Sequence, residues 1–139
     1  MKFMKKLAIL LVLAILVTAA VAQTPASKET AVSRPVVVKT VPAAGDTAVD
    51  PALREIQVTF SKDMLTDKMW SWVMESKETF PKMAGQPRYL DDKRTCVLPV
   101  ELQPGKTYKI WINSAKFDHF RDTANQPAVP FLLEFRTKG

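Results

Sequence analysis

The stretch TCVLPVELQPGKTYKIWIN, at residues 95–113, decides the fold that this sequence predicts. Apolar side chains recur at every second position in both halves of the stretch, and such alternation is typical of half-buried β-strands. They are Cys96, Leu98 and Val100 in the first half and Tyr108, Ile110 and Ile112 in the second. Between the halves, Pro104 and Gly105 suit the two central positions of a type II turn. We therefore expect two strands joined by a tight turn, with the rest of the chain packed on this hairpin as further strands.

Other segments show the same alternation. The clearest is 54–60, in which Ile56, Val58 and Phe60 share one face. Further strands are predicted at 36–41, 70–75, 88–90 and 131–137, with at most a short strand within the loop 76–86 and single helical turns at 51–53 and 67–69. In the strand at 70–75, Trp70, Trp72 and Met74 share one face. The sequence thus contains about seven strands at a spacing of roughly ten residues, and no long stretch with helical periodicity follows the N-terminal apolar segment. This pattern predicts an all-β, seven-stranded antiparallel β-sandwich.

The N-terminal segment predicts export. Lys2, Lys5 and Lys6 precede an apolar run at 7–17, and Ala20-Val21-Ala22 forms a small-x-small cleavage site. We expect a signal peptide over 1–22, a flexible tail over 23–34 and one domain over 35–139. An uncleaved membrane anchor is the alternative, but its apolar run is short for a spanning helix. A secreted or periplasmic location is therefore predicted, with membrane contact only through the signal peptide before cleavage.

The charge of the mature chain excludes one class of partner. Three of the 20 basic residues and none of the 14 acidic residues lie in the signal segment, which leaves a net charge of +3. Such a small charge, spread along the chain, gives no reason to expect nucleic-acid binding.

Two residues in the first half of the stretch 95–113 allow specific predictions. Cys96 is the single cysteine, so no intramolecular disulfide can form, and its place beside Leu98 predicts a small buried hydrophobe. A reactive thiol is the alternative. Pro99 cannot donate to a sheet ladder, so it predicts an edge strand or a bulge.

Several motifs occur in order between residues 35 and 137. They are PAAGD at 42–46, IQVTFSKDM at 56–64, LQPGKTY at 102–108, DTAN at 122–125 and FRT at 135–137. Together they resemble bacterial Ig-like domains of the S-layer SbsA type, although Ala124 stands where that family often has Gly. The family usually occurs as one module of a long surface protein. The resemblance implies a seven-stranded Ig-like sandwich with a non-catalytic role in binding or assembly.

One loop gathers chemically active side chains, namely Asp118, His119, Asp122 and Asn125. A metal site is one hypothesis, but a single His is a weak basis for a transition metal, and calcium requires six to eight oxygens in a preorganised loop. We favour the alternative, in which these side chains cap turns. No metal and no other cofactor is therefore predicted.

Catalysis is not predicted either. His119 is the only imidazole that could act as a base, and the sequence contains no G-x-S-x-G nucleophile motif. The chain also resembles CopC-like periplasmic copper proteins in its signal segment, its P-x-x-G and F-S pairs and its L-x-P-G motif. The methionines Met64, Met69, Met74 and Met83 could supply thioethers. However, those proteins ligate copper with an N-terminal His, whereas this mature chain begins at Gln23.

Trp111 is the most interesting aromatic residue, because it points away from the face formed by Ile110 and Ile112. If that second face is solvated, Trp111 is exposed beside Lys109 and Asn113 and could anchor a protein or carbohydrate. Alternatively, the loop 76–86, which contains Phe80, covers it.

The sequence thus predicts a non-enzymatic, secreted or periplasmic module for binding or protein–protein interaction at the cell envelope. Its partner is expected to be an envelope protein or a carbohydrate. The candidate partner-binding residues are Trp111, Lys109, Asp118 and His119.

Overall fold

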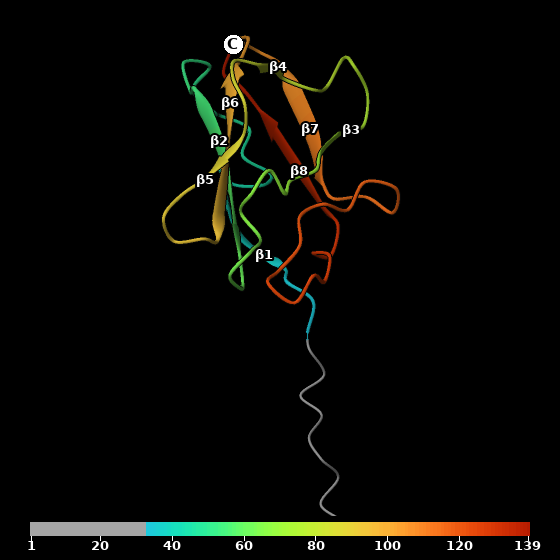
Figure 1. The fold of residues 1–139 in the computed structure, drawn as a ribbon. Coiled ribbons are helices and arrows are strands. Elements are labelled where there is room, and N and C mark those ends of the chain that lie inside the picture. The colour runs from blue at the N-terminus through green and yellow to red at the C-terminus, as the bar shows by residue number, and fades with distance from the viewer. Residues whose placement is uncertain (1–32) are drawn as a thin grey trace, which may run out of the picture. The chain divides into compact units, whose positions relative to one another are not determined.

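Residues 33–139 are described by the structure, a computed structural model, and form two packed antiparallel β-sheets (Figure 1). The strands are β1 (Val37–Val41), β2 (Glu55–Phe60), β3 (Trp72–Met74), β4 (Lys82–Met83), β5 (Arg88–Tyr89), β6 (Thr95–Glu101), β7 (Thr107–Ile112) and β8 (Phe131–Arg136). One sheet runs β1-β2-β6, with β4 and β5 both paired to β6 on the side opposite β2. The other sheet runs β3-β7-β8.

This strand order is that of a constant-type immunoglobulin sandwich, with a four-position sheet facing a three-stranded one. The short strands β4 and β5 together occupy the fourth position of the first sheet. The predicted seven-stranded Ig-like sandwich is therefore confirmed, and the eighth strand arises because the fourth position is split. The short strand expected at most within 76–86 is β4.

The predicted hairpin is wrong. β6 pairs with β2, β4 and β5, whereas β7 pairs with β3 and β8, so the two strands of residues 95–113 lie in opposite sheets. The alternation nevertheless identified the buried faces, because all six apolar residues at those positions are buried in one core. A period of two determines which side chains face inward but leaves the pairing partner open.

The turn at Pro104-Gly105 therefore crosses between the sheets, and two buried side chains hold it. Gly105 adopts a φ of +63°, as the predicted turn requires. The Thr137 hydroxyl accepts from the Lys106 N–H at 2.9 Å and donates to the Gln103 carbonyl. The Tyr108 hydroxyl accepts from the Gln103 N–H at 2.8 Å. Tyr108 lies at the start of β7, and its hydroxyl forms a hydrogen bond with the backbone a few residues upstream. This arrangement is the tyrosine corner of Ig-like sandwiches.

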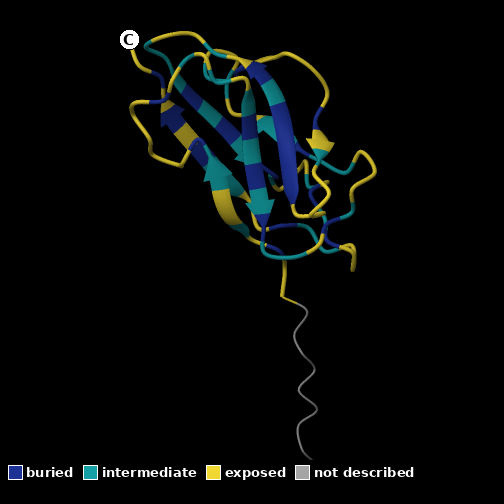
Figure 2. Ribbon diagram, turned by 90° about the vertical axis from the view of Figure 1, so that its left-hand side faces the viewer, coloured by how far each residue is buried: buried dark blue, intermediate teal, exposed yellow. Residues whose placement is uncertain are grey.

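The core lies between the sheets, and buried positions alternate with half-buried ones along β2 and β7 (Figure 2). Aromatic rings pack within it: Phe60 of β2 lies 5.0 Å from Phe120, which follows β7, and Tyr108 stacks on its β8 neighbour Phe135 at 5.4 Å between ring centroids. Cys96 is fully buried in this core, and burial raises the pKa of its thiol to about 12. The prediction of a small buried hydrophobe is confirmed.

The sequence predicts an edge strand or a bulge at Pro99; its strand is paired on both sides, so the edge position is wrong, but the register opposite it is irregular between Met83 and Arg88. The Pro99 carbonyl accepts from the Ala84 N–H at 2.9 Å, whereas the Val100 N–H donates on the other side to the carbonyl of Arg54, the residue before β2, at 2.8 Å. The Pro99 nitrogen therefore points to the place where pairing changes from β4 to β5. No ladder hydrogen bond is needed there, which explains why proline is tolerated.

Two local predictions need correction. The strand expected at 70–75 is shortened to Trp72–Met74. The helical turn expected at 67–69 does not form, because Lys68 has a φ of +54°, in the left-handed region. At 51–53, Asp50 organises a single turn, in which its carboxylate accepts from the Ala52 N–H at 2.8 Å and its carbonyl accepts from the Leu53 N–H at 3.0 Å.

The predicted signal peptide at 1–22 and most of the predicted tail at 23–34 lie outside the described residues. Within residues 33–139, the structure contains no helix that has the length and apolar character needed to cross a membrane.

Candidate functional site

The four candidate residues from the sequence fall on two neighbouring regions. Lys109 and Trp111 lie on the outer face of β7, where Trp111 is half-buried in register with Val73 on one side and Leu132 on the other. Asp118 and His119 belong to the loop that follows β7. The loop 76–86 does run along β7, since the Lys109 N–H donates to Thr79 at 3.0 Å.

Phe80 of that loop does not cover the outer face. It packs against the core, while Met83 is 46% exposed on β4. Trp111 is therefore neither free in solvent nor covered by Phe80, and forms the middle of a half-buried apolar row across the three-stranded sheet.

The carboxylates of the loop 114–130 are engaged in holding its turns. Asp118 accepts from the Arg121 guanidinium at 2.9 Å. Asp122 is buried, and one of its oxygens accepts from the Ala124 and Gln126 N–H groups at 3.0 and 2.9 Å. Asn125 carries the positive φ of this turn, which explains why alanine can stand at 124. Among residues 33–139, no group of three or more His, Cys, Asp and Glu could hold a metal ion.

The methionines considered as copper ligands are dispersed. Met64 is 2% exposed within the core, whereas Met74 and Met83 are exposed on β3 and β4. Burial of Met64 accords with a gap-filling role for its thioether.

Asn113 positions the start of this loop. It is fully buried with a φ of +59°. Its amide donates to the Phe120 and Ala128 carbonyls at 3.0 and 3.1 Å and accepts from the Phe120 N–H at 3.0 Å. Sequence reasoning placed Asn113 beside Trp111 on the second face and missed this role. The signal that could have revealed it is an asparagine, which tolerates left-handed backbone, at the end of an apolar strand.

A groove of about 360 Å³ runs along β3, and we call it the β3 groove. Its lining residues are Trp70, Ser71, Trp72, Val73, Met74, Phe117 and His119. Met74 and Phe117 are about half exposed, at 48% and 51%, although both are large apolar side chains. The His119 N–H donates to the Ser71 hydroxyl at 2.9 Å, which fixes the loop 114–130 against β3.

The backbone of β3 is open along this groove. β3 pairs with β7 alone, and Asn113 donates to the Ser71 carbonyl at 3.1 Å. Because backbone groups alternate in direction along a strand, Val73 also faces β7, and Trp72 and Met74 turn their N–H and C=O groups outward. The site thus combines apolar side chains with a strand edge that has free hydrogen-bonding groups.

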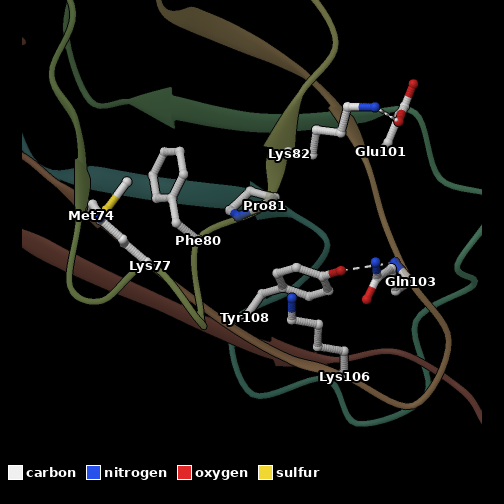
Figure 3. A pocket seen from close by; sticks show the side chains of 9 residues that line it. All are labelled: Met74, Lys77, Phe80, Pro81, Lys82, Glu101, Gln103, Lys106 and Tyr108. Atoms are coloured by element: carbon white, nitrogen blue, oxygen red, sulfur yellow. Dashed lines mark hydrogen bonds and ion pairs between the residues drawn. The ribbon is translucent and has the colours of Figure 1, made fainter.

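A second hollow, of about 260 Å³, adjoins the first at Met74, and we call it the lysine pocket (Figure 3). It is lined by Met74, Lys77, Phe80, Pro81, Lys82, Glu101, Gln103, Lys106 and Tyr108. Lys82 pairs with Glu101 at 2.8 Å, and this hydrogen bond and charge hold the pKa of Glu101 below its usual value. The Lys106 ammonium lies 5.3 Å from the centre of the Tyr108 ring.

Sequence reasoning identified His119 and the aromatic face of Trp70 and Trp72. It missed the exposure of Met74 and Phe117, and it missed the lysine pocket altogether. The three lysines come from the connection after β3, from β4 and from the turn before β7, so no sequence pattern links them.

The comparison with protein-family models agrees with the fold. The family model described as bacterial Ig-like domain matches residues 31–137. No curated protein matches the chain. Two structures of the S-layer protein SbsC, one of rSbsC(31-844) and one of its domains 1-6, are similar, each with 22% identity and a TM-score of 0.49. Each comparison covers 78% of this chain and 14% of the S-layer chain, so this chain spans a small part of their length.

The family match extends over most of the chain and includes every strand of the sandwich. The resemblance noted from the sequence motifs is confirmed, and the protein belongs to the bacterial Ig-like domain family.

Proposed function

We propose that the mature protein is a non-enzymatic, extracytoplasmic interaction module, and that a partner protein docks along the β3 groove. The observation that carries this proposal is the exposure of Met74 and Phe117 beside a strand edge with free backbone groups. Met and aromatic residues are enriched at protein interfaces, where an apolar centre supplies most of the affinity. An extended partner segment could also add hydrogen bonds to β3.

A row of half-buried apolar side chains continues from the groove across the three-stranded sheet. Val73 lines the groove and pairs in register with Trp111, which in turn pairs with Leu132. The predicted residues Trp111 and Lys109 therefore take peripheral places in the proposed interface, and His119 lies within its centre. A stable protein interface buries roughly 1,200 Å² or more in total, so a partner must cover this row as well as the groove.

A protein fits the groove better than a carbohydrate. Each hydroxyl of a sugar loses hydration on binding and needs a new hydrogen-bond partner. Apart from indole nitrogens, the lining side chains offer the Ser71 hydroxyl, which is already bonded to the loop, and the His119 imidazole. An apolar side chain from a protein needs no such partners.

Photo-crosslinking in the native envelope tests the proposal. p-Benzoylphenylalanine placed at Phe117 is expected to give a discrete adduct of higher mass, which mass spectrometry then identifies. The same group at Val38, which is 60% exposed on β1, is expected to give none. The mass of the exported protein, measured by mass spectrometry and expected to match a chain that begins at Gln23 as glutamine or pyroglutamate, tests the extracytoplasmic part of the proposal.

A matched pair of substitutions adds specificity. Met74→Asp should abolish the Phe117 adduct, whereas Met83→Asp should leave it unchanged, because Met83 has nearly the same exposure, 46% against 48%, but lies outside the groove. Equal adducts at Phe117 and Val38, or equal effects of the two aspartates, would contradict docking along β3.

A further inference from the structure

We propose that the segment bound along the β3 groove carries an acidic side chain that occupies the lysine pocket. This inference rests on the proposed function and adds the chemistry of the partner: an apolar anchor residue followed or preceded by Asp or Glu on an extended chain.

The charge balance of the pocket supports an anionic ligand group. Lys77, Lys82 and Lys106 line it, and Glu101 is the one carboxylate in its lining. Within residues 33–139, ion pairs engage Lys82 but leave Lys77 and Lys106 without a carboxylate partner. Two ammonium groups are thus available at the rim, and an ammonium attracts a carboxylate as a point charge.

The position of the pocket indicates how one ligand could reach both sites. Met74 lines both the groove and the pocket, so the two hollows adjoin at the end of β3. Lys77 follows Met74 by three residues in the connection that leaves the strand. A segment paired with the open edge at Trp72 and Met74 advances by about 3.3 Å per residue, so it passes the pocket within a few residues of its anchor.

The lysines are expected to determine selectivity more than affinity. Lys77 and Lys82 are exposed, and solvent weakens each ion pair that such residues form. Charge complementarity at the rim of an interface mainly selects the partner and speeds association. The apolar anchor in the β3 groove should therefore supply the affinity, and acidic residues should decide which extended segments are accepted.

Selection from a displayed library of random heptapeptides tests the inference. The mature protein is expected to enrich peptides with an aromatic or aliphatic residue and an Asp or Glu at a fixed distance from it. The double variant Lys77→Glu/Lys106→Glu should still enrich the apolar residue but lose the acidic preference. The control variant Lys39→Glu/Lys93→Glu changes the charge equally at two exposed residues outside both hollows, and should retain it.

Direct binding gives the magnitude. Measured by fluorescence polarisation at low salt, the most enriched peptide should bind the Lys77→Glu/Lys106→Glu variant about tenfold more weakly than the control variant. This difference should shrink as added salt shortens the screening length to about 3 Å near 1 M.

The possible outcomes separate the two proposals. Two results would overturn the inference and leave the groove proposal standing. In the first, the selected peptides depend on Met74 but show no preference for acidic residues. In the second, the acidic preference remains in the Lys77→Glu/Lys106→Glu variant. Docking along β3 predicts that Met74→Asp weakens binding of the selected peptides and that Met83→Asp does not. If no selected peptide shows this difference, docking along β3 is refuted, and the inference is refuted with it.

Discussion

Replacement of Asn113 by alanine should strongly destabilise the domain, because Asn113 holds the backbone of the loop 114–130 against the end of β7. Its amide makes three hydrogen bonds to the backbone of Phe120 and Ala128, and the side chain is fully buried. A buried hydrogen bond contributes about 1 kcal/mol, so the loss of three costs about 3 kcal/mol.

Backbone conformation adds to this cost. Asn113 has a φ of +59°, a region that asparagine tolerates better than alanine. We expect about 1 kcal/mol more from this source, which gives about 4 kcal/mol for Asn113→Ala. Asn113→Gly loses the same hydrogen bonds but has no side chain to strain the backbone, so it should cost about 3 kcal/mol.

Thermal unfolding of both variants, followed by circular dichroism, provides the measurement. A loss of 3 kcal/mol should lower the Tm of a domain of this size by about 15 °C, and the alanine variant should melt a few degrees below the glycine variant. A loss below 1 kcal/mol for Asn113→Ala would show that water or a shifted loop replaces these bonds. Equal Tm values for the two variants would refute the backbone contribution.

Three further predictions concern other buried or bonded groups. Thr137→Val should cost about 2 kcal/mol in denaturant titrations, because it leaves the Gln103 carbonyl and the Lys106 N–H without their partner, while Thr137→Ser should cost less. The Cys96 thiol, whose pKa burial raises to about 12, should resist Ellman's reagent at pH 8 until denaturant unfolds the chain; labelling of the folded protein would contradict its burial. Desolvation of the Asp92 carboxyl is outweighed by hydrogen bonds from Thr95 and the Arg94 N–H, which lower its pKa below that of the unfolded chain. Its stabilisation is therefore present above the unfolded value of about 3.9 and is lost as the pH falls through the folded value, so Asp92→Ala should lower the Tm at pH 7 but only weakly at pH 2.

The sequence predicted the strands and the core well, because both depend on local alternation. Ile56, Val58 and Phe60 of β2 are buried as expected, and so is Cys96 of β6. Pairing could not be predicted in the same way. The turn at Pro104-Gly105 would suit a hairpin, but the hydroxyls of Thr137 and Tyr108 bond to its backbone and make it a crossing between sheets.

The candidate site was less predictable, since it depends on which residues meet across the fold. Asn113 follows an apolar strand, and its side chain is buried because the loop folds back and places the Phe120 and Ala128 carbonyls against its amide. The lysines of the pocket come from three separate segments, and their proximity is a property of the sandwich. Met74 belonged to a predicted apolar face, but it is exposed because β3 ends there at the edge of its sheet.

Within the loop 114–130, stability and recognition are assigned to different residues. Asp122 is buried and bonded to backbone, while Phe117 is 51% exposed and extends over the β3 groove. Substitution of an exposed residue typically changes stability by less than about 0.5 kcal/mol. Phe117→Asp should therefore leave the Tm almost unchanged and still prevent partner crosslinking from a probe at Met74. Asn113→Gly, by contrast, should lower the Tm and weaken the crosslink only as the temperature approaches unfolding. If Phe117→Asp lowered the Tm as much as Asn113→Gly does, Phe117 would be part of the loop's structural support, and the β3 groove would lose its principal apolar contact for a partner.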